Sequence, residues 1–418
     1  MAESQIKTIW RNYMSIQDKI KQYIADNWPG TVRNNKEDAD TLIGLPYPYS
    51  VSGFENVFQE MYYWGTYFTN VGLILSNQVE QAKNNVDNML YLIDRFGFVP
   101  NANRTWGLTR SQPPFLSEMV KDIYDVIGDK DWLSGCYKAL CDEYKFWQTA
   151  RMSDCGLNRY SGYYPDSKFL CLRLSSRFNI EMPEDEAVIE EYAQAFHSGC
   201  ESGWDFSSRT GLNQHRYAWV CLNSLLYGME NNMAYFSKEI CNGEEKIWKK
   251  RAKSRKTLMN KLMWNKSIGA FCDYNFVENR TSDFISLAML YPLFVGLADK
   301  RQASKTMKNL SKIELEHGLS GTEKRDDLFN LQWDYPHVWP PLQLLAIKAL
   351  IRYGYTEDAK RIARKYLNVV ELNFEKHGRL WEKYNGVDGE ISITKEYTTP
   401  PLMGWSAATY LYCCEIAK

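Results

Sequence analysis

Apolar residues recur at intervals of three and four positions through most of the chain, as in Ile6, Trp10, Tyr13, Met14 and Ile20 near its start. This spacing places side chains on one face of an α-helix, whereas the strict alternation typical of β-strands is rare. The pattern predicts about thirteen helices. Their approximate bounds are 4–25, 56–77, 78–95, 115–127, 131–150, 186–201, 213–238, 243–264, 283–298, 301–312, 340–354, 356–376 and 402–417.

The predicted helices follow one another without a low-complexity linker, and Gly, Pro and Asn clusters such as residues 44–48 and 399–401 fall between them. We therefore expect a single domain over residues 1–418, with residues 1–45 as an N-terminal helical lead-in. Antiparallel helix pairs can close into a ring or stack as an open solenoid. The chain lacks the fixed sequence period of solenoids, so the prediction is an all-α barrel.

Charge and composition exclude several classes of function. Lys and Arg number 50 against 51 Asp and Glu, so no net field attracts nucleic acid or an anionic membrane surface. The ten Cys and five His residues show no metal-ligand spacing, and we expect neither a metal ion nor a cofactor. No basic and apolar leader opens the chain and no apolar run approaches the roughly 18 residues of a membrane span, which favours a cytoplasmic protein.

Three segments between predicted helices combine acids, Trp, Arg and Gln, the residue types that a sugar site needs for proton transfer, stacking and hydroxyl recognition. Residues 200–209 contain Asp205, which taken alone is as typical of a helix cap as of a catalyst. Residues 380–386 contain Glu382, which taken alone is typical of a surface. Residues 331–341 hold two Trp and three Pro, and such a stiff apolar segment suits the wall of a cleft.

Several motifs, in the same order, resemble those of the trehalase-type inverting glycoside hydrolases. They are Pro-Asn and Asn-Arg at 100–104, Arg-Ser-Gln-Pro-Pro at 110–114, Glu-Ser-Gly-Trp-Asp at 201–205, Gln-Trp-Asp and Trp-Pro-Pro within 332–341, Glu-Lys-Tyr at 382–384, and Glu-Tyr with Gly-Trp within 396–405. Relatives in this group include trehalases, glucosylglycerate and mannosylglycerate hydrolases and glucosidase I type enzymes. The resemblance implies a single-domain (α/α)6 barrel and inversion of the anomeric configuration.

The resemblance also implies roles for individual residues. Asp205 matches the general acid and Glu382 the general base, two carboxyl groups that in inverting enzymes lie roughly 6.5–9.5 Å apart on either side of the sugar. We expect the aromatic neighbours of Asp205 to favour its protonated form. The substrate-binding positions implied by the resemblance are Phe58, Tyr62, Trp64, Asn101, Arg110, Gln112, Arg159, Asp166, Trp204, Trp333, Glu396 and Trp405.

Three positions depart from the trehalase pattern. Val57 and Tyr164 stand where trehalases carry Arg, and Gly65 stands where they carry an Asp that binds the sugar being cleaved off. Loss of one hydrogen bond to a charged group typically costs about 1.5–3 kcal/mol. A structural explanation for Gly65 would be close packing of the backbone. The missing arginines argue against trehalose as the substrate.

Three hypotheses follow. The first is an inverting α-glycosidase that hydrolyses a small α-linked glucoside or related disaccharide other than trehalose, with Asp as acid and Glu as base. The second is a true trehalase in which other side chains replace the lost contacts. The third is a catalytically impaired sugar-binding pseudoenzyme. In each case the expected partner is a small carbohydrate, with no nucleic acid or membrane involved.

Overall fold

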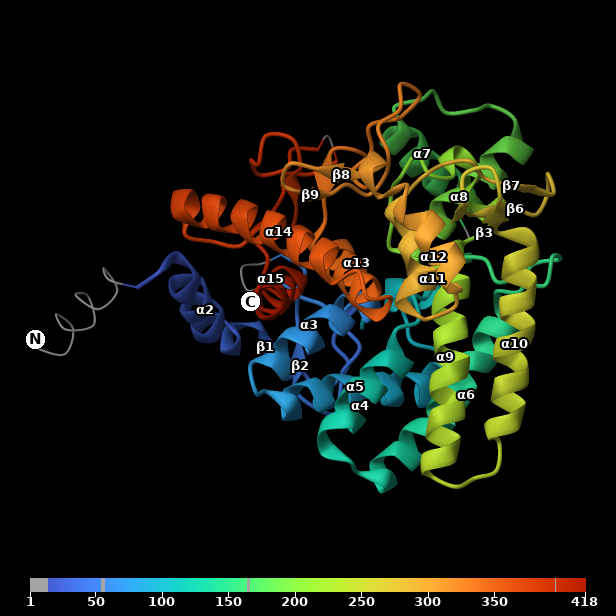
Figure 1. The fold of residues 1–418 in the computed structure, drawn as a ribbon. Coiled ribbons are helices and arrows are strands. Elements are labelled where there is room, and N and C mark those ends of the chain that lie inside the picture. The colour runs from blue at the N-terminus through green and yellow to red at the C-terminus, as the bar shows by residue number, and fades with distance from the viewer. Residues whose placement is uncertain (1–13, 54–56, 164–165, 395) are drawn as a thin grey trace, which may run out of the picture.

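Six of the described helices pack side by side into a closed ring in this structure, a computed structural model that describes residues 14–53, 57–163, 166–394 and 396–418. Each helix contacts the next, and the last returns to the first (Figure 1). The ring consists of α3 (Tyr63–Leu75), α5 (Leu116–Ile127), α9 (Val220–Glu239), α11 (Tyr291–Phe294), α13 (Pro340–Arg352) and α15 (Gly404–Ile416). The N- and C-terminal parts of the chain are thereby joined.

A second layer of helices covers the outside of this ring. It consists of α2 (Ile16–Asn27), α4 (Val79–Phe96), α6 (Lys130–Ala150), α10 (Glu245–Leu262), α12 (Lys300–Met307) and α14 (Thr356–His377). The two layers differ in burial: every residue of α3 from Tyr63 to Leu73 is buried, whereas α10 buries only Trp248, Ala252, Arg255 and Met259. That spacing is one helical face, as expected for an outer helix.

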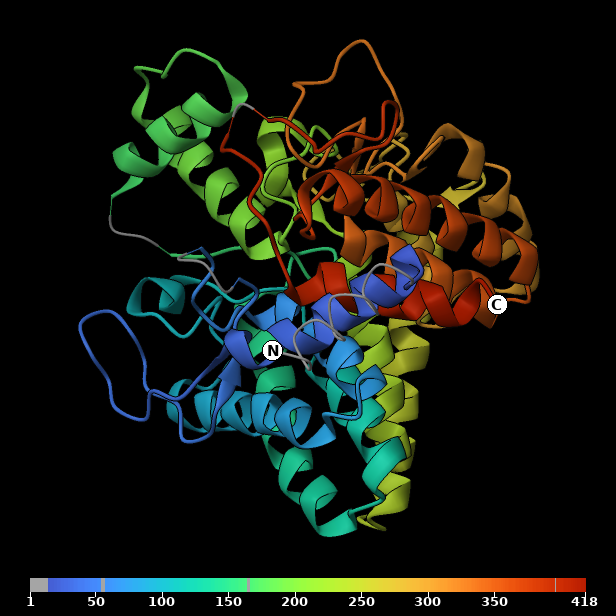
Figure 2. The ribbon, with the colours of Figure 1, turned by 90° about the vertical axis from the view of Figure 1, so that its left-hand side faces the viewer.

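A further helix pair, α7 (Ser167–Phe178) and α8 (Glu186–Ser202), packs together beside the ring (Figure 2). It has a small core separate from the main one, formed by Leu174, Phe178, Ala195, Cys200, Phe206 and Leu331. Leu331 lies in the Trp- and Pro-rich segment and Phe206 directly follows Asp205. This core therefore joins the helix pair to two of the segments singled out in the sequence.

Short antiparallel strand pairs connect the helices. They involve β1 (Val32–Arg33), β2 (Tyr49–Ser50), β3 (Tyr217–Ala218), β4 (Trp264–Asn265), β5 (Ala270–Phe271), β6 (Tyr274–Asn275), β7 (Arg280–Thr281), β8 (Glu314–Leu315), β9 (Gly318–Leu319), β10 (His337–Val338) and β11 (Tyr384–Asn385). The pair β10–β11 matters for the site, because it joins the Trp- and Pro-rich segment to the segment that carries Glu382.

The helical barrel expected from the sequence is confirmed, with corrections to single elements. Helix α7 was not predicted, although Leu170, Leu174 and Phe178 recur at four-residue spacing and are buried. The prediction of one helix over 283–298 is wrong, since only a 3-10 turn at Leu287–Leu290 and the short α11 form before Gly296, which has a positive φ of 74°.

Two predicted helices begin at the wrong place, and the start of a third lies outside the described residues. The helix expected from residue 56 starts at Tyr63, because Phe58 adopts a positive φ of 52°. The helix expected from residue 213 starts at Val220, behind a 3-10 helix at Gly211–Arg216 and β3. The helix predicted over 4–25 is described only from residue 14 onward, where α2 forms, and residues 1–13 lie outside the described part.

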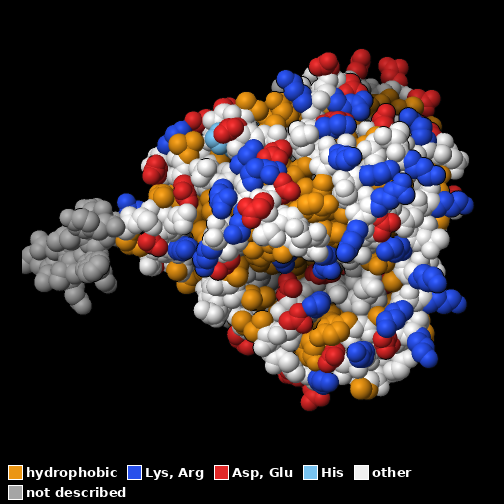
Figure 3. Space-filling model, in the orientation of Figure 1, with side chains coloured by type: hydrophobic (Ala, Val, Ile, Leu, Met, Phe, Trp, Pro, Cys, Tyr) orange, Lys and Arg blue, Asp and Glu red, His pale blue; other side chains and the backbone are white. Residues whose placement is uncertain are grey.

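Lys and Arg side chains gather along the right-hand edge of the molecule in Figure 3, where α10 lies. Exposed members on this helix are Lys246, Lys249, Lys250, Arg251 and Lys253. Arg255 differs, because it is buried and pairs with the buried Glu230 at 2.9 Å. No helix in the described part of the chain is both long and apolar enough to cross a membrane.

Candidate active site

A cavity of about 560 Å³ collects most of the residues singled out in the sequence. Both presumed catalytic carboxyl groups line it, although they are separated by far more than one hundred residues along the chain. The predicted site residues that line the cavity are Phe58, Tyr62, Trp64, Asn101, Arg110, Gln112, Asp205, Trp333, Glu382 and Trp405. The volume is that of a small-molecule site.

Four predicted residues lie elsewhere. Trp204 is fully buried and does not line the cavity, and its ring centroid lies 5.5 Å from that of Trp333. Arg159 is directed to the carbonyl of His215 at 3.5 Å, and Asp166 is exposed and caps α7 by accepting from the Phe169 amide. Glu396 lies behind Arg177, a residue that does line the cavity.

Asp205 is delivered to the cavity by the end of α8. The helix stops at Ser202, and Gly203 caps it with a positive φ of 72°. A side chain at Gly203 would also collide with the Trp64 ring, since its Cβ would lie 2.8 Å from a ring carbon. Beyond the turn, the carbonyl of Asp205 accepts a hydrogen bond from the Gln332 side chain. The acid candidate is therefore fixed on both sides.

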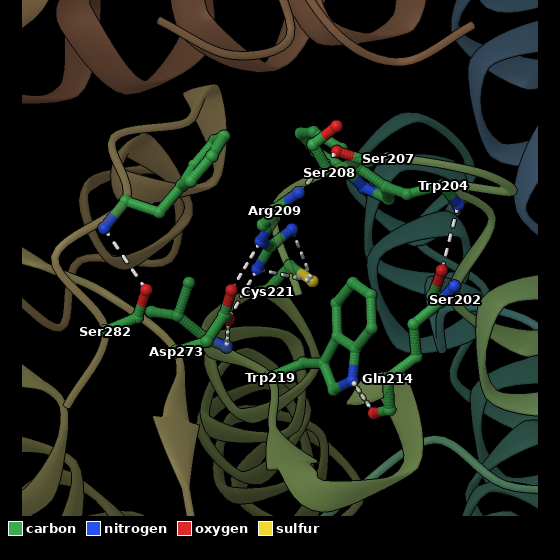
Figure 4. Close-up of polar contacts among 12 residues, drawn as sticks. Ser202, Trp204, Ser207, Ser208, Arg209, Gln214, Trp219, Cys221, Asp273 and Ser282 are labelled. Carbon is green, nitrogen blue, oxygen red and sulfur yellow. Dashed lines mark hydrogen bonds and ion pairs between the residues drawn. The ribbon is translucent and has the colours of Figure 1, made fainter. Parts of the chain in front are cut away.

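The residues after Asp205 are tied down by two buried carboxylates. Asp334 accepts hydrogen bonds from the Ser207 hydroxyl at 3.0 Å and from the Ser208 amide at 2.8 Å. Arg209 forms a two-pronged ion pair with Asp273 at 2.5 and 2.6 Å, between the Trp204 and Trp219 rings (Figure 4). Buried, fully paired groups of this kind hold a loop in one conformation.

Burial raises the pKa of Asp205 to about 6. The positive charges of Arg177 and Arg110 oppose this shift, and the negative charge of Glu382 adds to it. A carboxyl group with such a pKa keeps its proton over a useful part of the physiological range, which is what a general acid requires.

Glu382 has a different environment. Its carboxylate forms an ion pair with Lys383 at 2.6 Å and accepts one hydrogen bond from the Tyr397 hydroxyl, whose oxygen lies 2.8 and 3.0 Å from the two carboxylate oxygens. Lys383 is fully buried and stacks over the rings of Trp339 and Tyr397. Two donor groups, the Lys383 ammonium and the Tyr397 hydroxyl, are thus directed at one buried carboxylate, the type of group that a general base requires.

Tryptophan rings form the wall between these two groups. Trp333 and Trp339 stack in parallel with centroids 3.8 Å apart, and Trp64 contacts Trp333 at 5.6 Å and Trp405 at 6.0 Å. The Trp405 indole also donates to the carbonyl of Glu382 at 3.2 Å. Such flat apolar faces suit the apolar face of a sugar ring.

The segment around Arg110 supplies further polar groups to the cavity. Glu201, buried at the end of α8, pairs with Arg151 at 2.8 Å and accepts from the Ser111 amide at 2.8 Å, which fixes the segment in place. The Gln112 side chain accepts from the Trp64 amide at 3.2 Å. Arg110 lines the cavity, and its buried Nε has no hydrogen-bond partner among the described residues.

Gly65 lines the cavity, and the packing around it does not require a glycine. A Cβ at this position would lie 3.7 Å from the Ser52 hydroxyl and 3.8 Å from the Tyr62 Cβ, which are ordinary contacts. The explanation by close backbone packing is therefore wrong. Val57 also lines the cavity, while Tyr164 lies outside the described residues.

Several residues in and beside the cavity were missed by the sequence reading. Lys383 and Tyr397 lie inside quoted motifs but their contacts to Glu382 become visible only in three dimensions. Gln332 and Trp339 line the cavity from the Trp- and Pro-rich segment, whereas Trp106 lines it from the stretch between the motifs at 100–104 and 110–114. Arg177 is different, because it lies on the unpredicted α7 and no motif pointed to it.

In the part of the chain that the structure describes, no group of three or more His, Cys, Asp or Glu residues is placed to hold a metal ion. The chemistry available to the cavity from its own side chains is acid–base chemistry between carboxyl groups, with aromatic and guanidinium side chains to hold a polyhydroxylated ligand.

Comparisons with known proteins agree with this description. The sequence profile of the family described as Trehalase matches residues 3–417. The periplasmic trehalase of Xanthomonas oryzae is 33% identical over 391 residues, which cover 87% of this chain and 67% of that protein. The periplasmic trehalase of Pseudomonas aeruginosa is 32% identical, with 88% of this chain and 70% of that protein covered.

Solved structures give the same answer for the fold. The neutral trehalase of Saccharomyces cerevisiae superposes with a TM-score of 0.77 and 30% identity, over 89% of this chain and 74% of that one. A mannosylglycerate hydrolase of Thermus thermophilus superposes with a TM-score of 0.63, over 94% of this chain and 99% of that one, at 15% identity, which supports the fold alone. The chain therefore belongs to the trehalase family and is a glycoside hydrolase.

Proposed function

We propose that the protein is an inverting α-glycosidase for a small α-linked disaccharide, in which Asp205 is the general acid and Glu382 the general base. The observation that carries the proposal is the contrast between two carboxyl groups that line one cavity. Burial raises the pKa of Asp205, whereas Glu382 forms an ion pair with Lys383 and accepts a hydrogen bond from the Tyr397 hydroxyl. In the proposed reaction Asp205 protonates the glycosidic oxygen and Glu382 activates water on the opposite face of the sugar.

The remaining predicted cavity residues would bind the sugar. Trp64, Trp333 and Trp405 would stack on its apolar face, while Arg110 would donate to its hydroxyls. Phe58, Tyr62, Asn101 and Gln112 would complete the binding site. Arg159, Asp166 and Trp204 line no part of the cavity, so for them we propose supporting rather than contacting roles.

Two substrate classes compete. Gly65 and Val57, both at the cavity and both different from the trehalase pattern, favour an α-linked glucoside other than trehalose. The names of the relatives favour trehalose itself, with new contacts replacing the old ones. The relatives in Xanthomonas and Pseudomonas are periplasmic by name, and for this chain a cytoplasmic location stays a prediction.

The test is a hydrolysis screen of purified protein against trehalose, kojibiose, nigerose, maltose, isomaltose, glucosylglycerate and mannosylglycerate, with proton NMR of the first anomer released. Release of a β-anomer from one α-linked substrate supports inversion and names the substrate. Silence across the panel together with thermal stabilisation by a sugar would support the pseudoenzyme instead.

A further inference from the structure

Arg177 reaches the cavity from an unexpected element. It lies in the last turn of α7. This helix packs on α8, and Asp205 follows the end of α8, so α7 and Asp205 lie on the same side of the molecule. Figure 2 shows this helix pair standing beside the chain that leads into α15. Arg177 connects the helix pair to that part of the chain, because its Nη1 lies 2.7 Å from Oε2 of Glu396.

The two partners of the ion pair differ in exposure, and this difference leaves N–H donors of Arg177 for a ligand. Glu396 is almost covered, with 6% of its side chain exposed, whereas 22% of the Arg177 side chain is exposed and lines the cavity. Within the described residues the guanidinium makes one hydrogen bond, the one to Glu396. Since a guanidinium carries five N–H donors, the remaining ones are available on the cavity side.

The position of Arg177 indicates which part of a substrate it meets. In an inverting hydrolase the general acid lies beside the leaving group and the base lies across the cleaved sugar. Arg177 is close enough to Asp205 for its charge to be the largest one that opposes the rise in the pKa of that carboxyl. A substrate bound between Asp205 and Glu382 would therefore present its leaving group toward α7.

Charge decides the class of leaving group. Ionised Glu396 balances the charge of Arg177, so the pair offers hydrogen-bond donors with little net charge, and a carboxylate on the leaving group would be desolvated without gaining a full ionic partner. Hydroxyl oxygens accept from such donors without this penalty. The chain also carries Val57 where trehalases carry an Arg. The contact that this Arg makes in trehalases is therefore open to a guanidinium from another element, such as Arg177 on α7.

We propose that Arg177 is a specificity-determining residue that donates hydrogen bonds to hydroxyl oxygens of a neutral leaving sugar, and that Glu396 is the positioning residue that holds its guanidinium. The proposal rests on the proposed function, because it assumes that Asp205 faces the leaving group. It assigns the missing leaving-group contact to a helix that the sequence did not predict.

The test compares two substrates with the same glycosyl unit: the disaccharide found in the screen, and the α-glycosyl fluoride, whose leaving group has no hydroxyls. The variants are Arg177→Ala and Arg177→Lys, with Arg173→Ala as control, since Arg173 is an exposed residue on the same helix that does not line the cavity. Thermal unfolding of each variant establishes that it is folded.

We expect Arg177→Ala to lower kcat/KM for the disaccharide about ten- to hundred-fold more than for the fluoride, mainly through KM, as the loss of a charged hydrogen bond implies. Arg177→Lys should recover part of this loss, and Arg173→Ala should match the wild type with both substrates. Glu396→Gln should show the same selective loss in a weaker form.

Equal losses with both substrates would overturn the proposal, because they would mean that Arg177 acts on the fold or on Asp205 rather than on the leaving group. No loss with either substrate would also overturn it. A preference for glucosylglycerate over neutral disaccharides that disappears in Arg177→Ala would contradict the neutral class. If the wild type cleaves neither substrate, the proposed function itself fails, and this assignment fails with it.

Discussion

The two sides of the cavity treat a carboxyl group in opposite ways. On the side of α8, removal of the Asp205 carboxyl group from water raises its pKa, and the positive charges of Arg177 and Arg110 oppose this rise without reversing it. On the side of β11, Glu382 is buried and is held by an ion pair with Lys383 and one hydrogen bond from the Tyr397 hydroxyl. The two carboxyl groups therefore differ in the charged and hydrogen-bonding groups that surround them, and an acid and a base acting on one bond require such a difference.

Removal of the Asp205 or the Glu382 carboxyl group should have the largest effect on activity and tests both sides of the comparison. We expect Asp205→Asn and Glu382→Gln each to lower kcat for the disaccharide by about 10²–10⁴-fold, since each removes one partner of the acid–base pair. The control is Glu375→Gln, a matched change at an exposed position of α14. Appreciable activity in either cavity variant, measured in steady-state assays, would remove that residue from its role.

Loss of Lys383 tests the donor side of the comparison. Lys383→Met leaves Glu382 buried without its ionic partner, and breaking a buried pair in this way typically costs about 3–5 kcal/mol. We expect a drop of that order in the free energy of unfolding at pH 7, measured by denaturant titration. The double variant Lys383→Met with Glu382→Gln should recover much of the loss, because it removes the uncompensated charge.

The pH dependence sharpens the comparison without a mutation. Because the pKa of Asp205 in the folded protein is raised to about 6, the protonated form required of a general acid is lost as the pH rises through that value. We expect kcat/KM for the disaccharide to fall about tenfold per pH unit above it. Glu396, whose pKa burial raises to about 7, is coupled to Asp205, so the measured value belongs to the set of carboxyl groups.

A profile for the disaccharide that stays flat from pH 6 to 9 would contradict the assignment of Asp205. The α-glycosyl fluoride gives the internal control, because fluoride leaves without a proton from the enzyme and its hydrolysis should lack this alkaline decline.

Changes at Gly65 should have the smallest effect on stability. An Ala at this position meets ordinary contacts, and Ala is favoured over Gly in a helix by roughly 1 kcal/mol, so Gly65→Ala should raise the thermal midpoint slightly. Gly65→Asp should alter the ranking of sugars in the screen by about tenfold. An unchanged ranking would mean that this position does not set specificity.

The sequence predicted the barrel well because its inner helices are apolar nearly all round and its outer helices have one apolar face. Trp248, Ala252 and Met259 of α10 illustrate such a face. It failed where local chemistry interrupts the period, as at Phe58, whose backbone has a positive φ, and around the short α11, where a 3-10 turn and Gly296 replace a long helix.

For the site, the motifs named most of the cavity residues but not how they act. Nothing in the order of residues shows that Tyr397 donates to Glu382, or that Glu396 faces Arg177 rather than the open cavity. These are contacts between segments far apart in the chain. Arg177 was beyond reach for the same reason, since its meaning depends on where α7 packs.

The most direct test of the acid role of Asp205 and the base role of Glu382 uses the variants Asp205→Asn and Glu382→Gln. For each variant, the activity on the α-glycosyl fluoride is measured and divided by the activity on the disaccharide. Because fluoride needs no general acid but the attacking water still needs a base, Asp205→Asn should retain most of the fluoride hydrolysis while Glu382→Gln loses it. Equal loss of both activities in Asp205→Asn, or retention of fluoride hydrolysis in Glu382→Gln, would contradict the assignment.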